Sequence, residues 1–190
     1  MRRILLALAA AILLAACNQG GDEQGSGAAA AAPNDADVTF TQNMLPHHQQ
    51  AIEMAALVDS HTKRPELRTL AEGIAASQGQ EITLLQGWLK TWGKPATPEG
   101  TDHGAMQMPG MMSEADMRQL RVTKDEDFDL AFMDMMTAHH EGAIEMANTE
   151  LRDGALPEVK RLAQQIIDAQ QGEIDQFKKW QQEWKATPSQ

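Results

Sequence analysis

FMDMMTAHHEGAIEMA, at residues 132–147, closely matches an earlier stretch, FTQNMLPHHQQAIEMA, at residues 40–55. The two copies are 92 residues apart, and the same offset continues without a gap through Trp92 and Trp184. An ungapped match of this extent indicates an internal duplication. The chain is therefore expected to contain the same structural unit twice.

Each copy begins with a long amphipathic helix, expected at residues 37–60 in the first copy and 124–152 in the second. At about 100° per residue, two adjacent histidines of each helix lie inside its apolar stripe. These histidines are His47, His48, His139 and His140.

Local signals add two expectations about these helices. Pro46 precedes the first histidine pair and predicts a kink there, whereas the second copy has Ala138 at the same position. Thr123 and Glu126 form a capping-box pattern, which predicts that Thr123 caps the start of the second of these helices.

Each copy ends with a second helix that a first-turn proline opens, Pro65 for residues 64–93 and Pro157 for residues 157–186. A glutamine and a glutamate three residues apart lie on the apolar face of each of these second helices. Burying such polar groups costs free energy unless they form hydrogen bonds or ion pairs. Antiparallel packing about the intervening turns brings these side chains to the level of the histidines. They are Gln78 and Glu81 in the first copy, and Gln170 and Glu173 in the second.

Two duplicated helical hairpins predict an all-α fold, a four-helix bundle of the ferritin-like kind. The hairpins are expected at residues 37–94 and 123–187, and a methionine-rich connection at residues 95–122 joins them. Within this connection, Ser113 followed by Asp116 predicts a short helix that ends at about residue 121.

Residues 1–17 are interpreted as a lipoprotein signal peptide. Two arginines precede an apolar run that is too short for an ordinary membrane span, and the run ends in Leu-Ala-Ala-Cys at Cys17, which resembles a bacterial lipobox. Acylation of Cys17 would anchor an exported protein to the periplasmic side of a membrane, and the protein itself would not span that membrane. A signal peptide cut elsewhere is the alternative. Residues 18–36, rich in Gly, Ser and Ala, predict a flexible tether.

Composition excludes several classes of function. The net charge of −11 argues against nucleic acid as a partner, because its binding requires a basic surface. The single cysteine excludes an intramolecular disulfide. No Gly-rich phosphate loop or nucleophile elbow occurs, so an enzyme is not expected. The sequence is compatible with a homo-oligomer.

The duplicated histidines allow two interpretations. Imidazole suits copper, zinc, iron or nickel, and the four rings would bring nitrogen ligands to the centre of the bundle. Adjacent residues diverge, so one histidine of each pair is expected to face its mate across the core while the other contacts the neighbouring helix. The alternative is a buried hydrogen-bonded network in which Glu81, Glu173 and the two glutamines satisfy the histidines without a metal.

Methionine is abundant, at 12 of 190 residues. Thioether is a soft ligand that favours Cu(I). Helical methionines usually pack in the core, but we expect burial not to account for those of the central connection, which makes them candidate metal contacts. The candidates there are His103, Met106, Met108, Met111 and Met112.

Three motifs resemble a bacterial family of ferritin-like helical bundles, domain of unknown function 305: MLPHHQQAIEMA, MPGMMSEADM and MMTAHHEGAIEMA. The resemblance covers about residues 38–184. It implies a four-helix fold, export to the cell envelope, and copper binding or resistance, since at least one family member is a periplasmic copper-binding protein. Gln49-Gln50 stands where the second copy has Glu141-Gly142, so the two halves need not be equivalent. The candidate ligands carried over by motif are Met44, His47, His48, Met54, Met136, His139, His140 and Met146.

The sequence therefore supports three hypotheses. The first is an exported, lipid-anchored protein that sequesters or passes on copper. The second is a structural or adaptor bundle whose His/Gln/Glu layer only determines helix register. The third and least favoured is a metal-dependent oxidase, because the helices lack the Glu-x-x-His motifs of a di-iron bundle.

Overall fold

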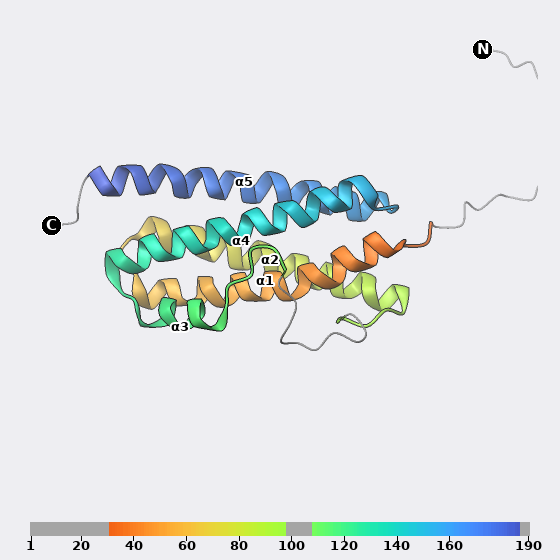
Figure 1. Ribbon diagram of the computed structural model, residues 1–190, viewed down its shortest axis with the longest axis horizontal. Helices are drawn as coiled ribbons and strands as arrows, with labels where there is room; N and C mark the ends of the chain where they lie inside the picture. Colours follow the sequence, from red (N-terminus) through yellow and green to blue (C-terminus); the bar gives the residue numbers. More distant parts are fainter. Residues whose placement is uncertain (1–30, 98–107, 187–190) are drawn as a thin grey trace, which may run out of the picture. The chain divides into compact units, whose positions relative to one another are not determined.

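The computed structural model describes residues 31–97 and 108–186, with the side chains described as far as residue 184 (Figure 1). This part of the chain is all α-helical and contains no strand. None of its helices is long and apolar enough to cross a membrane. The predicted signal peptide with Cys17, most of the predicted tether, and the candidate ligands His103 and Met106 lie outside the described residues. The five helices are α1 (Asp35–His61), α2 (Pro65–Trp92), α3 (Glu114–Val122), α4 (Asp125–Asp153) and α5 (Pro157–Ala186).

The four long helices confirm the predicted pair of hairpins. α1 packs against α2 and α4 packs against α5, and the two hairpins meet where α1 packs against α4. α1 and α4 run in opposite directions, so that the start of each lies beside the end of the other (Figure 1). The short helix α3 lies against both α1 and α4.

Helix boundaries follow local chemistry closely, with one exception. Ser113 and Asp116 form the capping box that starts α3, as predicted. The predicted capping box of Thr123 and Glu126 is wrong: Lys124 is the N-cap of α4 and no side chain caps it. Thr123 instead ends α3, where its hydroxyl donates to the carbonyl of Gln119 at 2.8 Å. Because α3 and α4 are almost contiguous, the last turn of α3 takes the hydroxyl that α4 would need.

Two prolines stand at the start of a helix and a third lies inside one. Pro65 occupies the first turn of α2, and α5 begins at Pro157, as predicted. α1 continues through Pro46 as one helix. The kink at Pro46 stays a prediction.

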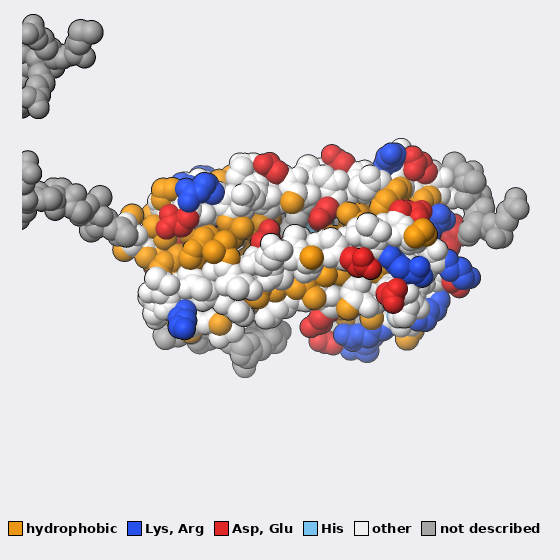
Figure 2. Space-filling model, turned by 180° about the vertical axis from the view of Figure 1, so that it is seen from behind, with side chains coloured by type: hydrophobic (Ala, Val, Ile, Leu, Met, Phe, Trp, Pro, Cys, Tyr) orange, Lys and Arg blue, Asp and Glu red, His pale blue; other side chains and the backbone are white. Residues whose placement is uncertain are grey.

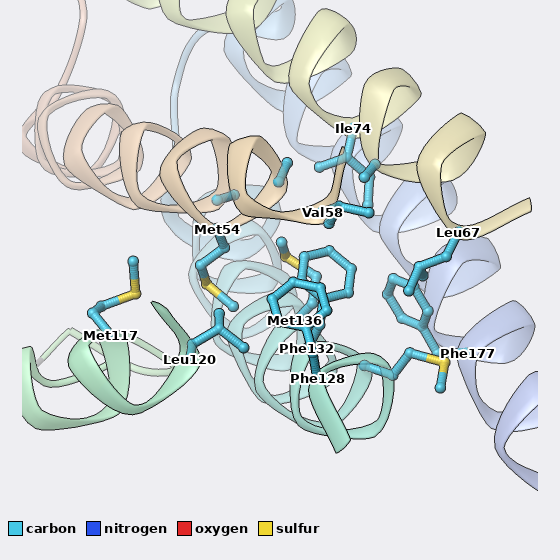
Figure 3. Close-up of a cluster of buried hydrophobic side chains, with 14 of the residues drawn as sticks. Met54, Val58, Leu67, Ile74, Met117, Leu120, Phe128, Phe132, Met136 and Phe177 are labelled. Carbon is cyan, nitrogen blue, oxygen red and sulfur yellow. The ribbon is translucent and has the colours of Figure 1, made fainter. Parts of the chain in front are cut away.

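Buried apolar side chains form two clusters at opposite ends of the bundle. One contains Phe128, Phe132 and Phe177 together with Met117 and Leu120 of α3, which point toward Met54 of α1 (Figure 3). The other contains Phe40, Met44, Leu85 and Leu89 from α1 and α2, with the last turns of α4 and the first half of α5. The buried histidines lie in sequence between the residues of the two clusters, so they form a polar layer that divides the apolar core. This layer, here called the histidine layer or simply the layer, consists of His47, His48, His139 and His140.

Two buried aspartates tie the hairpins together, one at each end of the α1–α4 contact. Asp37 accepts hydrogen bonds from the backbone N–H groups of Ala155 and Leu156, at 3.0–3.2 Å, in the turn between α4 and α5. Its duplicated counterpart, Asp129, pairs with Arg64 at 3.3 Å in the turn between α1 and α2. Burial opposes ionisation of Asp37, but the hydrogen bonds from Leu156 and Asn34 outweigh it and lower the pKa of this carboxyl.

Replacement of Asp37 by alanine is expected to destabilise the bundle by about 3 kcal/mol, because it leaves buried backbone N–H groups without partners. Urea unfolding followed by circular dichroism measures the change. Asp35→Ala is the matched control, since Asp35 is an exposed residue of the same helical turn. Equal stability of the two variants would contradict this role of Asp37.

Glu150 lies buried beside Asp37, with 1% of its surface exposed. Burial, reinforced by the neighbouring Asp37 carboxylate, raises the pKa of Glu150 to about 8. The folded protein therefore keeps a proton on Glu150 at neutral pH, whereas the unfolded chain releases it above the ordinary value of 4.5.

Between pH 4.5 and 8 the folded state binds one more proton than the unfolded chain. The free energy of unfolding therefore decreases as pH rises, by up to about 1.4 kcal/mol per pH unit from Glu150 alone. Glu150→Gln keeps a donor for Asp37 and removes this titration. The variant is expected to become more stable relative to wild type as pH increases from 5 to 8, measured as the difference in unfolding free energy. A difference that does not change with pH would contradict the raised pKa.

Candidate functional site

All four predicted histidines lie where α1 crosses α4, and none has any exposed surface. They come from the middle of the two long helices, one pair from each copy of the repeat. Consistent with this burial, no histidine side chain is visible on the face shown in Figure 2, where charged side chains of both signs gather toward the right-hand end. The inward orientation predicted from the helical pattern is confirmed.

His47 and His139 face each other across the contact between α1 and α4. Their ring centroids are 3.7 Å apart and the ring planes are tilted by 39°. These two residues correspond under the duplication, so the approximate twofold relation between the hairpins passes between them. The prediction that one histidine of each pair faces its mate is confirmed.

The other histidine of each pair contacts the neighbouring helix, as predicted. His48 Nε2 lies 2.6 Å from Glu81 Oε2 on α2, and His140 Nε2 lies 2.6 Å from Glu173 Oε2 on α5. Both contacts are short, but the ring N–H groups are not aimed well enough to count as hydrogen bonds. The two glutamates are about four-fifths buried, so the charge of each is only partly solvated. Level packing of the histidines and glutamates is therefore confirmed in both hairpins.

Gln78 and Gln170 are also buried in this part of the bundle, each with 3% of its surface exposed. Their side-chain carbonyl oxygens have no hydrogen-bond partner among the described residues. The alternative in which these glutamines complete a satisfied network is not supported at these two atoms.

The layer keeps its central imidazoles neutral. Burial, followed by repulsion from His48, lowers the pKa of His47 to about 3. Burial and the neighbouring His47 lower the pKa of His139 well below its ordinary value. A neutral imidazole is the form that binds a metal ion, because the protonated ring has no free lone pair.

Residues Met108–Met112, here called the strap, lie over the contact between His47 and His139. The Pro109 carbonyl accepts a hydrogen bond from His47 Nε2 at 3.1 Å. Gln50 holds the far end of the strap by two hydrogen bonds: its amide nitrogen donates to Met112 O at 2.9 Å, and its oxygen accepts from Met112 N at 2.7 Å.

On α4 the strap is accommodated by Gly142. A Cβ atom at this position would lie 2.1 Å from Pro109 O and 2.7 Å from Gly110 N. Gly110 itself has φ 76°, and a Cβ there would meet the carbonyls of Ala138 and His139. Backbone contact this close requires glycine on both sides.

The predicted non-equivalence of the two copies thus has a structural basis. Gln50 and Gly142 are corresponding positions, and each contacts the same strap in a different way. Neither residue was predicted to have a role, although their difference was visible in the sequence.

The candidate methionines occupy different environments. Met44, Met54 and Met136 are fully buried, and Met146 is half-buried against the second apolar cluster. Met108, Met111 and Met112 are half-buried in the strap. The expectation that burial does not account for the methionines of the connection is wrong for Met112, which packs against the first apolar cluster because the strap lies on the bundle.

Several ring nitrogens of the layer lack hydrogen-bond partners. They are both nitrogens of His48, His139 and His140, and Nδ1 of His47. Buried polar atoms without partners are uncommon in folded proteins and call for an explanation such as a bound ion or water. No group of three or more His, Cys, Asp or Glu side chains is placed to hold a metal ion in the part of the chain that the structure describes. Imidazole nitrogen is a ligand that copper, zinc, iron and nickel all accept.

Comparisons with known proteins agree with this architecture. The family model described as "Domain of unknown function (DUF305)" matches residues 37–181, and the chain belongs to this family. No curated protein matches the chain.

Three solved structures show the same fold. A DUF305 fragment from Deinococcus radiodurans is 34% identical with a TM-score of 0.70, over 78% of this chain and 96% of that one. A proposed secreted DUF305 protein from Streptomyces coelicolor is 33% identical with a TM-score of 0.70, over 75% and 89%. CopM in its Cu(II)-bound form is 33% identical with a TM-score of 0.69, over 78% and 97%; it has also been crystallised with Cu(I) and with Ag.

The buried histidines predict an acid-labile bundle. The unfolded chain protonates these rings below about pH 6.5, whereas the folded state holds His47 neutral down to about pH 3. Stability is therefore unaffected by His47 above pH 6.5 and decreases as pH falls from 6.5 toward 3.

His47→Gln is expected to reduce the loss of unfolding free energy between pH 6.5 and 4, because one of the rings that resists protonation is removed. His61→Gln is the control, since His61 lies outside the layer and donates or accepts at both ring nitrogens. Equal acid sensitivity of wild type and His47→Gln, measured by thermal unfolding at each pH, would contradict the neutral state of the ring.

Proposed function

We propose that this protein is exported, lipid-anchored through Cys17, and binds copper in the cell envelope to sequester it or pass it on. The observation that carries this proposal is the layer of four fully buried histidines with unpaired ring nitrogens at the centre of the duplicated fold. A protein that needed only apolar packing would gain stability from hydrophobic residues at these positions. The layer is expensive to bury, and metal binding accounts for it.

The solved relatives support the choice of copper. CopM, which shares the fold and a third of its residues with this chain, is seen with Cu(II), Cu(I) and Ag. Silver and Cu(I) are both soft ions that accept thioether and imidazole ligands. The proposed secretion of the Streptomyces coelicolor relative agrees with export, and the signal-like residues 1–17 agree with a lipid anchor.

Among the candidate ligands, His47 and His139 are the best placed to hold the ion together, because they are the pair in direct contact. Met44 and Met136 lie one helical turn before them on the same faces and are fully buried, so they are the nearest thioethers along each helix. Bound copper would supply a soft Lewis-acid centre at the layer. His48 and His140 are already paired with glutamates and would orient and insulate the centre.

A structural role for the layer is the second candidate. It is favoured by the His48–Glu81 and His140–Glu173 pairs. In these pairs two of the four histidines have a polar partner within the bundle and need no metal ion. A bundle of this kind would use the layer to determine helix register. Stoichiometric iron or manganese in the purified protein would instead indicate the oxidase.

Copper titration distinguishes these functions. The wild-type protein is expected to bind Cu(I), measured by competition with a chromophoric chelator, and the double variant His47→Ala/His139→Ala is expected to lose at least about 100-fold in affinity. The control is His61→Ala, because His61 is a buried histidine outside the layer and hydrogen-bonds to Ser60 and to the carbonyl of Arg121. Unchanged affinity in the first variant, together with reduced stability, would favour the structural role.

A further inference from the structure

The hydrogen bond between His47 and the strap determines which nitrogen of His47 is protonated. A carbonyl oxygen only accepts hydrogen bonds, so the contact of 3.1 Å with Pro109 O requires a proton on His47 Nε2. Neutral imidazole carries one proton, and Nδ1 therefore keeps its lone pair. Nδ1 is buried and has no hydrogen-bond partner.

The duplication supplies two central histidines but only one strap. Neither ring nitrogen of His139 forms a hydrogen bond of good geometry, and the backbone of His47 makes only a minor contribution at this ring. The two rings of the central pair are consequently different: the strap carbonyl orients His47, and no strap residue hydrogen-bonds to His139.

Two residues hold the strap in this position from opposite sides. Gln50 on α1 makes two hydrogen bonds, of 2.7 and 2.9 Å, with the backbone of Met112. Gly142 on α4 leaves the space that Pro109 and Gly110 occupy, since its own Cβ would fall 2.1–2.7 Å from their backbone atoms. Their positions coincide under the repeat, so both copies contribute to the same restraint.

We propose that Gln50 and Gly142 are positioning residues that seat the strap so that the Pro109 carbonyl holds His47 as the Nε2–H tautomer and leaves Nδ1 as its ligand atom. This inference deepens the proposed copper site and rests on it for its functional meaning. Hydrogen bonds to the non-ligating nitrogen commonly orient a metal-binding histidine, and their loss typically weakens metal binding by 10–100-fold.

The tautomer can be measured in metal-free protein. Full-length chain labelled with ¹⁵N-histidine, purified in detergent and stripped of metal with a chelator, is compared with Gln50→Ala and Gly142→Ala. The controls are Gln49→Ala and Glu141→Ala, whose side chains are exposed one residue earlier on the same helices. Gly142→Ala raises helix propensity, so α4 stays helical and any change reports the strap rather than unfolding.

In wild type and both controls, His47 is expected to show one protonated nitrogen at Nε2 and one unprotonated nitrogen at Nδ1. In Gln50→Ala and Gly142→Ala the ring is expected to populate both tautomers. Hydrogen exchange at the Met112 amide should become faster in Gln50→Ala, on the order of tenfold, because its acceptor is lost. A single Nε2–H tautomer in both strap variants overturns the proposal.

Copper titration with Cu(I) completes the test. The strap variants are expected to bind Cu(I) at least about tenfold more weakly than the two controls. Mixed tautomers with unchanged Cu(I) affinity would overturn the assignment of Nδ1 as ligand atom. Absence of Cu(I) binding in wild type would instead contradict the proposed function, while the tautomer measurement would still decide whether the strap positions His47.

Discussion

The contact between His47 and His139 places two imidazoles against each other in the middle of the buried crossing of α1 and α4. Moving such groups out of water is costly, and the packing of α1 against α4 has to supply what solvent no longer does. The apolar clusters at either end of the bundle hold the crossing in place, and the buried aspartates Asp37 and Asp129 secure the two turns beyond them. The histidine layer thus lies between two apolar clusters, with a buried aspartate beyond each of them.

The approximate symmetry of the fold is broken at the strap. Corresponding helical positions carry Gln50 in one hairpin and Gly142 in the other, and one residue binds the strap while the other makes room for it. A long connection between hairpins has to cross the bundle somewhere, and here the strap, which precedes α3, crosses over the histidine pair. The symmetric core and the asymmetric strap together make two equivalent histidines chemically different.

The inner and outer histidines of the layer differ in their electrostatic surroundings. The inner rings, His47 and His139, are neutral because burial, followed by repulsion from neighbouring histidines, disfavours their protonated forms. The outer rings, His48 and His140, lie beside glutamates that are partly open to solvent. The centre of the layer therefore offers neutral lone pairs, while the carboxyl groups of Glu81 and Glu173 lie at its edges.

The amino-acid sequence by itself determined the helices, the duplication and the depth of the layer. Apolar periodicity and an ungapped offset report which side chains face inward, and the divergence of adjacent helical residues predicted that one histidine of each pair would face its mate while the other contacted the neighbouring helix. Only the tertiary structure decided which histidine does which: His47 faces His139, and His48 contacts Glu81 on α2. The path of the connection was decided only by the tertiary structure. Its hydrogen bonds join Gln50 to Met112 and His47 to Pro109, each across 62 residues, and such contacts leave no periodic signal in the chain. For the same reason the partners of Asp37 and the raised pKa of Glu150 could not be predicted, because both depend on which turn of one hairpin lies against the first turn of the other.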